Sequence, residues 1–152
     1  MCLGLGYPLV VFKMSRIDHI GIATESIEEA SNFWLQVGLH SGEDHINKEQ
    51  DVKIRMFYGK DKDGNRTHSK VELIEALSEN SPIAKFINKR GVGIQQLAIS
   101  VDNIDLMVSG LIESGIRMIN SKPTEGAGGH KIAFVHPEST GGVLVELVER
   151  IN

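Results

Sequence analysis

Two short runs of the sequence match each other: IDHIGIA at residues 17–23 and IQQLAIS at residues 94–100. Each run has apolar side chains at alternate positions, as in a β-strand with one buried face. A helix signal follows each run: a capping residue, an apolar stripe with helical spacing and a closing glycine, over 26–38 and 102–115. Such self-similarity predicts that the chain contains the same structural unit twice.

Three strand-like runs follow each predicted helix. An Asp63-Gly64 pair separates two runs in the first half, as expected for a hairpin turn. The predicted strands cover residues 39–43, 52–58 and 70–77 in the first half, and 117–120, 131–136 and 143–148 in the second. Each half therefore reads β-α-β-β-β.

These elements predict an α+β fold made of two tandem βαβββ modules, at residues 15–80 and 93–152. A linker over 81–92 reads as a short helix, with proline at its first position and glycine just past its end. Residues 1–14 are interpreted as an N-terminal extension. Neither module has enough residues to bury a core alone, so we expect mixed sheets with flanking helices on one face and a cleft on the other.

Composition limits the possible functions. The chain has 152 residues and a formal net charge of −4, so it lacks the basic excess that a nucleic-acid binder needs. Its single cysteine cannot form an internal disulfide, which favours the reducing cytoplasm. The apolar segment at the N-terminus is too short to span a bilayer, so we expect no membrane partner.

Four polar residues interrupt the predicted strands at matching places of the two halves: His19 and Glu72, then Gln96 and Glu146. Their apolar neighbours take the helix side, so these side chains should face the cleft. A lone histidine in a strand is more often a hydrogen-bonded structural residue than a ligand. A buried carboxylate, however, is costly unless it is paired or binds a metal. All four together predict a divalent-metal site.

Three stretches then identify a resemblance: residues 18–23, 81–86 and 126–147. The chain resembles the vicinal oxygen chelate group, the glyoxalase/bleomycin-resistance/dioxygenase superfamily, and within it the methylmalonyl-CoA epimerases. The resemblance covers residues 17–149 and implies a glyoxalase-type cleft. It also implies a divalent metal ion (Co, Zn, Ni, Mn or Fe), with ligands at the positions of His19, Glu72, Gln96 and Glu146.

The chain departs from the family pattern at two positions. Gln95 and Gln96 stand where family members typically carry two histidines, and Ile54 aligns with a glutamate base of some bacterial epimerases. Some glyoxalase I enzymes use Gln, Glu, His and Glu as ligands, with Gln and His in exchanged halves. That similarity is consistent with Gln96 as a ligand.

The resemblance implies a metal-dependent epimerase that removes the proton next to a metal-chelated carbonyl and interconverts methylmalonyl-CoA epimers. We assign Glu146 as the first candidate base and Glu72 as the second, with His130 and His136 as candidate substrate contacts. The expected partner is an acyl-CoA or another thioester, and the family implies a homodimer. Two alternatives are a glyoxalase I-like lactoylglutathione lyase and a non-catalytic protein that binds or sequesters a small molecule.

Overall fold

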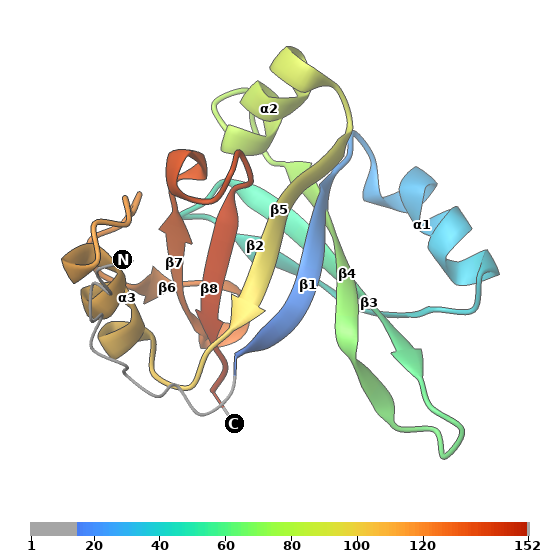
Figure 1. Cartoon of the computed structure of the whole chain (residues 1–152). Coiled ribbons are helices and arrows are strands. Elements are labelled where there is room, and N and C mark those ends of the chain that lie inside the picture. The colour runs from blue at the N-terminus through green and yellow to red at the C-terminus, as the bar shows by residue number, and fades with distance from the viewer. Residues whose placement is uncertain (1–14, 152) are drawn as a thin grey trace.

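The computed structural model describes residues 15–151, and the predicted N-terminal extension at 1–14 lies outside the described residues. Eight strands form one mixed sheet in the order β2-β3-β4-β1-β5-β8-β7-β6 (Figure 1). In chain order the elements are β1 (Arg16–Ala23), α1 (Ile27–Gln36), β2 (His40–Asn47), β3 (Val52–Lys60), β4 (Arg66–Ala76), α2 (Pro82–Arg90), β5 (Gly93–Ser100), α3 (Ile104–Glu113), β6 (Thr124–Glu125), the 3-10 turn η1 (Ala127–Gly129), β7 (Lys131–Val135), the 3-10 turn η2 (Pro137–Ser139) and β8 (Val145–Glu149).

The strand order is symmetric about the pair formed by β1 and β5, which run antiparallel. On each side of this pair, the last strand of a half lies parallel to the first: β4 beside β1, and β8 beside β5. The sequence repeat is therefore a structural repeat, and the α+β fold class is confirmed. The two halves join through β1 and β5 into one curved sheet instead of two separate sheets.

The same helix cap occurs in both halves. Glu75 at the end of β4 accepts a hydrogen bond from the backbone N–H of Ile27 at 2.8 Å, and Glu149 at the end of β8 does so from Ile104, also at 2.8 Å. A carboxylate at a helix N-terminus satisfies an otherwise unpaired donor and complements the helix dipole. The N-cap of α3 is Asn103, whose side-chain oxygen accepts a hydrogen bond from the N–H of Leu106 at 3.0 Å.

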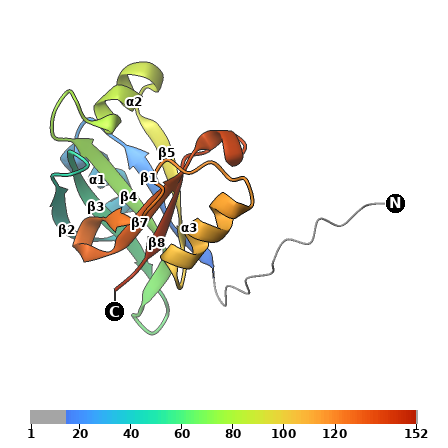
Figure 2. The same ribbon diagram turned by 90° about the vertical axis from the view of Figure 1, so that its left-hand side faces the viewer.

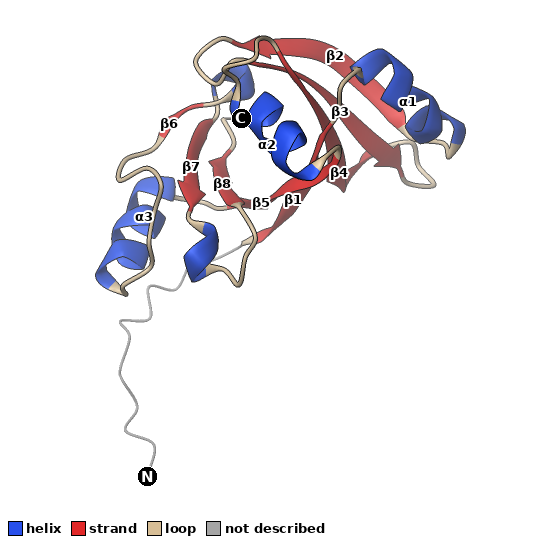
Figure 3. Cartoon of the chain, turned by 90° about the horizontal axis from the view of Figure 1, so that it is seen from above, coloured by secondary structure: helices blue, strands red, loops and turns tan. Residues whose placement is uncertain are grey.

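Helices α1 and α3 cover the sheet at its two ends (Figures 1 and 2). Under α1, the fully buried Ile27 packs with Phe57 and Leu73. Under α3, Val108 packs with Ala133 and further residues of β7 and β8. These contacts bury part of the apolar stripe of each helix, whereas Phe33 of α1 and Ile112 of α3 stay exposed. Neither helix covers the opposite face of the sheet (Figure 3).

Helix α2 crosses the end of the curved sheet (Figures 1 and 3). Ile83, Phe86 and Ile87 of this helix pack against Ala23 and Ile74. The linker thereby closes one end of the hollow formed by the sheet. Within residues 15–151, no helix combines the length and the apolar character that crossing a membrane requires.

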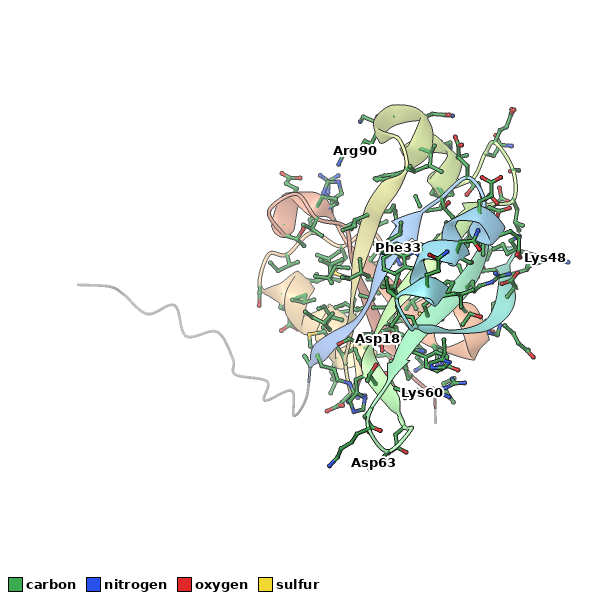
Figure 4. All side chains as sticks on the ribbon, turned by 90° about the vertical axis from the view of Figure 1, so that its right-hand side faces the viewer. Asp18, Phe33, Lys48, Lys60, Asp63 and Arg90 are labelled. Atoms are coloured by element: carbon green, nitrogen blue, oxygen red, sulfur yellow. The ribbon has the colours of Figure 1, made fainter. Side chains whose placement is uncertain are left out.

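Two segments, the β3–β4 hairpin and residues 117–120, bear on the strand predictions. Gly64 has a φ of 83° in the β3–β4 hairpin, whose tip carries Asp63 (Figure 4), as the Asp-Gly pair predicts. The strand predicted at 117–120 is wrong: only Met118 forms an isolated bridge there, and the short β6 comes later. The side chain of Asn120 accepts the N–H of Phe134 at 3.0 Å, so a side chain takes a bond that a strand carbonyl would otherwise accept.

Candidate metal centre and substrate cleft

The four polar residues predicted to meet in the cleft do meet. They come from the four central strands, and each side chain is buried. His19 Nε2 lies 3.6 Å from Glu72 Oε2 and 3.5 Å from Glu146 Oε2. Gln96 Nε2 donates to Glu146 Oε2 at 2.5 Å. Two carboxylates, one imidazole and one amide therefore converge at the centre of the sheet.

Gly21 creates the space for this cluster. It lies opposite Glu72 in the pairing of β1 with β4, and opposite Gln96 in the pairing of β1 with β5. A Cβ atom at Gly21 would lie 2.5 Å from Cγ of Gln96. Only glycine leaves room for the Gln96 side chain in this position.

Gly21→Ala is therefore expected to displace Gln96 and to destabilise the fold by about 1–3 kcal/mol, the usual cost of overpacking a buried site. The shift of the urea unfolding midpoint measures this effect. Gly42→Ala serves as the control, because a Cβ atom at Gly42 would have only an ordinary contact, 3.7 Å from the carbonyl oxygen of Met56. Equal unfolding midpoints for the two variants would contradict the packing argument.

Asp18 contacts Nδ1 of His19, whereas the other ring nitrogen, Nε2, faces Glu72 and Glu146. The pairing of β1 with β5 shifts between Ile17 and His19, so Asp18 is the extra residue of a bulge. This irregularity lets Asp18 Oδ2 reach His19 Nδ1 at 2.7 Å. Asp18 also accepts hydrogen bonds from Arg150 Nε at 2.8 Å and Lys70 Nζ at 3.2 Å. Asp18 was not among the predicted site residues, because strict alternation places it on the opposite face.

The electrostatics of the cluster favour an additional positive charge. Burial opposes a charged imidazole, but the carboxylates of Glu72 and Glu146 and the bond to Asp18 outweigh it and raise the pKa of His19. Burial also raises the pKa of Glu72. For Asp18, burial is outweighed by Arg150, His19 and Lys70, which hold the pKa of this carboxyl well below its usual range.

These residues fit a divalent cation. Nε2 of His19 is buried without a hydrogen-bond partner, although it points between two carboxylates. The bond from Nδ1 to Asp18 orients the ring, as commonly seen for histidine ligands of metals. Within residues 15–151, no three His, Cys, Asp or Glu side chains already form a complete metal-binding group. A cation held here would draw the ligands together or use the amide of Gln96 as well.

A cavity of about 390 Å³ opens from this cluster, within the range of small-molecule pockets. Glu72, Gln96 and Glu146 line its floor, and Glu49 is the remaining carboxylate on its wall. No lysine or arginine lines it among the described residues. The rest of the lining is mainly aliphatic and amide side chains, so the cavity combines an acidic floor with apolar walls.

Gln95 is a second site residue that was not among the predicted ones. The β1–β5 pairing shifts again between Gly21 and Ile22, which leaves Gln95 as the extra residue of β5 and brings it to the cavity beside Gln96. Its Oε1 is buried without a hydrogen-bond partner. The signal was the repeat itself, since Gln95-Gln96 occupies the place of Asp18-His19.

The two histidines predicted to contact substrate lie elsewhere. His130 lines a neighbouring cavity, and its Nδ1 accepts the N–H of Ile151 at 2.9 Å. His136 caps η2, where its Nδ1 accepts the N–H of Glu138 at 3.1 Å. Neither side chain lines the cavity above the metal-ligand candidates, so their substrate roles stay predictions.

Comparison with known proteins places this geometry in a family. The model of the glyoxalase/bleomycin resistance protein/dioxygenase superfamily matches residues 18–134. The chain belongs to this superfamily. The matched segment contains three of the four converging residues of this glyoxalase-superfamily chain, and Glu146 follows it on β8.

Relatives extend the match beyond the family model. Uncharacterized protein YqjC of Bacillus subtilis is 37% identical over 137 residues, covering 90% of this chain and 93% of the relative. Mitochondrial methylmalonyl-CoA epimerase of Bos taurus is 34% identical over 139 residues, covering 90% and 75%. A Streptomyces coelicolor methylmalonyl-CoA epimerase variant, solved with 2-nitronate-propionyl-CoA, has a TM-score of 0.82 at 32% identity, covering 90% of this chain and 98% of that one. The predicted superfamily and its epimerase-like subgroup are confirmed; the predicted homodimer stays a prediction.

Proposed function

We propose that the chain is a metal-dependent epimerase that interconverts the epimers of methylmalonyl-CoA or of a closely similar 2-alkylmalonyl thioester. Relatives named methylmalonyl-CoA epimerase support an enzyme of the isomerase class. The observation that carries the proposal is the unpartnered Nε2 of His19 between two buried carboxylates on the floor of a cavity.

The charge of the cavity supports the proposal of a bound cation. A malonyl thioester carries a free carboxylate, which a floor made of Glu72 and Glu146 would repel. Of residues 15–151, no lysine or arginine lines the cavity to compensate for this repulsion. A divalent cation held by His19, Glu72, Gln96 and Glu146 would balance both carboxylates and let the substrate anion enter. When bound, such a cation supplies Lewis acidity, which makes the α-proton of a chelated thioester more acidic.

Proton transfer then falls to the carboxylates of the chain. Epimerisation needs one group to remove the α-proton from one face and another to return a proton to the other face. Glu146 and Glu72 approach His19 from strands on opposite sides of the β1–β5 pair. Ile54, which also lines the cavity, cannot take part in proton transfer. We assign Glu146 as the first base and Glu72 as its counterpart.

Exchange of the α-proton in deuterated buffer tests this function. Protein supplied with a divalent cation should exchange the α-proton of methylmalonyl-CoA, and exchange should stop after chelation and resume when the cation is returned. The hemithioacetal of methylglyoxal and glutathione serves as the alternative substrate. Exchange or turnover of only the hemithioacetal would show a glyoxalase I-like lyase instead. Binding of thioesters without any proton exchange would indicate a non-catalytic binding protein.

A further inference from the structure

A second cavity, of about 460 Å³, lies beside the first and differs from it in charge. The two share Ile54 and Ala127 as lining residues, so they are neighbours along the same hollow. The second cavity is lined by residues of β2, β3 and β4, by the η1 turn and by the end of the chain after β8. Its size is also typical of a small-molecule site.

Cationic side chains dominate this lining. Arg66, Lys70 and Arg150 line it together with one carboxylate from the described part of the chain, that of Glu43. Lys70 and Arg150 share one ion-pair partner, Asp18, so the pair retains an excess positive charge. The chain as a whole has a formal net charge of −4, so the positive charge of this cavity is opposite in sign to that of the whole chain.

Arg66 differs from Lys70 and Arg150 because it has no ion-pair partner among the described residues. It stacks over the ring of Tyr58, 4.0 Å from the ring centroid. Stacking holds the planar guanidinium in place while its N–H donors stay free for an anion. Both side chains line the cavity.

Three histidines complete the donor set: His45, His68 and His130. Each imidazole can donate an N–H to an oxygen. Burial, Arg150 and Lys70 lower the pKa of His130, as expected beside cations that lack enough counter-charge.

We propose that the second cavity binds a phosphate-ester group and that Arg66 contacts it directly. Arginine forks and several N–H donors match phosphate oxygens, while a malonyl carboxylate would be drawn to the first cavity if a cation is bound there. Resting on the proposed function, the natural source is the nucleotide end of an acyl-CoA whose acyl group occupies the first cavity. A free phosphate would satisfy the same chemistry.

Calorimetric titration with coenzyme A, pantetheine and inorganic phosphate tests the site without any turnover. Coenzyme A should bind the native protein more tightly than pantetheine, which lacks the phosphates. Arg66→Gln should weaken coenzyme A binding about tenfold, the usual effect of one lost charged hydrogen bond, and leave pantetheine unchanged. Arg117→Gln is the matched control, because Arg117 is an exposed arginine paired with Glu138 and lines neither cavity.

The outcomes distinguish coenzyme A from free phosphate as the ligand, and they distinguish the anion site from the proposed epimerase reaction. Arg66-dependent binding of inorganic phosphate, with equal affinities for coenzyme A and pantetheine, would support the anion site and assign it to a free phosphate. Binding of both coenzyme A and phosphate that is unchanged in Arg66→Gln would overturn the site. Loss of α-proton exchange with Arg66-dependent coenzyme A binding intact would instead count against the proposed reaction alone.

Discussion

Glu146→Gln should lower the rate of α-proton exchange by about 10²–10⁴-fold, the range for loss of a general base. The amide keeps the shape of the side chain but cannot accept the proton. Glu146 is buried on the cavity floor and close to both His19 and Gln96, so no exposed group can replace it. The rates are measured by deuterium incorporation at saturating divalent cation, because the substitution is also expected to weaken metal binding.

Glu49→Gln provides the control for this variant. Glu49 is a carboxylate in the same cavity, but it is exposed and forms no ion pair with His19. We expect its exchange rate to remain near that of the native protein. Full activity in Glu146→Gln would remove Glu146 from the role of base, and Glu72→Gln would then be the variant to examine.

Asp18→Asn should lower the affinity for a divalent cation by about 10–100-fold, the typical effect of losing the carboxylate behind a histidine ligand. The aspartate fixes the His19 ring through Nδ1 and is itself held by Arg150 and Lys70. An amide in its place loses the negative charge that makes the imidazole a stronger ligand. Competition with a metal-binding dye measures the affinity directly and does not depend on the reaction.

Asp44→Asn is the matched control for this experiment. Asp44 likewise accepts two hydrogen bonds from one arginine, Arg55, at 2.5 and 2.9 Å, but it lies on β2 away from His19. Its metal affinity should equal that of the native protein. If the two aspartate variants had the same metal affinity, Asp18 would be a structural residue only.

Much of the fold could be predicted because its two halves repeat the same periodic pattern. The strands β1 and β5 and the helices that follow them carry both a clear period and a cap. The segment at 117–120 had neither, and side-chain bonding by Asn120 replaced the expected strand. The pairing of β1 with β5 depends on long-range register, which period alone does not specify.

The candidate site was predictable as far as strict alternation holds. His19, Glu72, Gln96 and Glu146 lie mid-strand between apolar neighbours, and the structure brings them together. Asp18 and Gln95, which bulges bring to the site, were not predicted, and neither was the second cavity. Two of its cations, Arg66 and Lys70, lie on β4 and the third, Arg150, follows β8 at the end of the chain, so no local pattern in the sequence connects Arg66 with Arg150.

A cation at the meeting point of the four central strands is the central requirement of the proposed function. Anomalous scattering from crystals grown with Co²⁺ locates such an ion without reference to any reaction. We predict a peak at ligand distance from His19 Nε2 and Glu146, with Glu72 or Gln96 completing the coordination. A map with no peak beside His19, in protein saturated with Co²⁺, would contradict the metal centre and with it the proposed function.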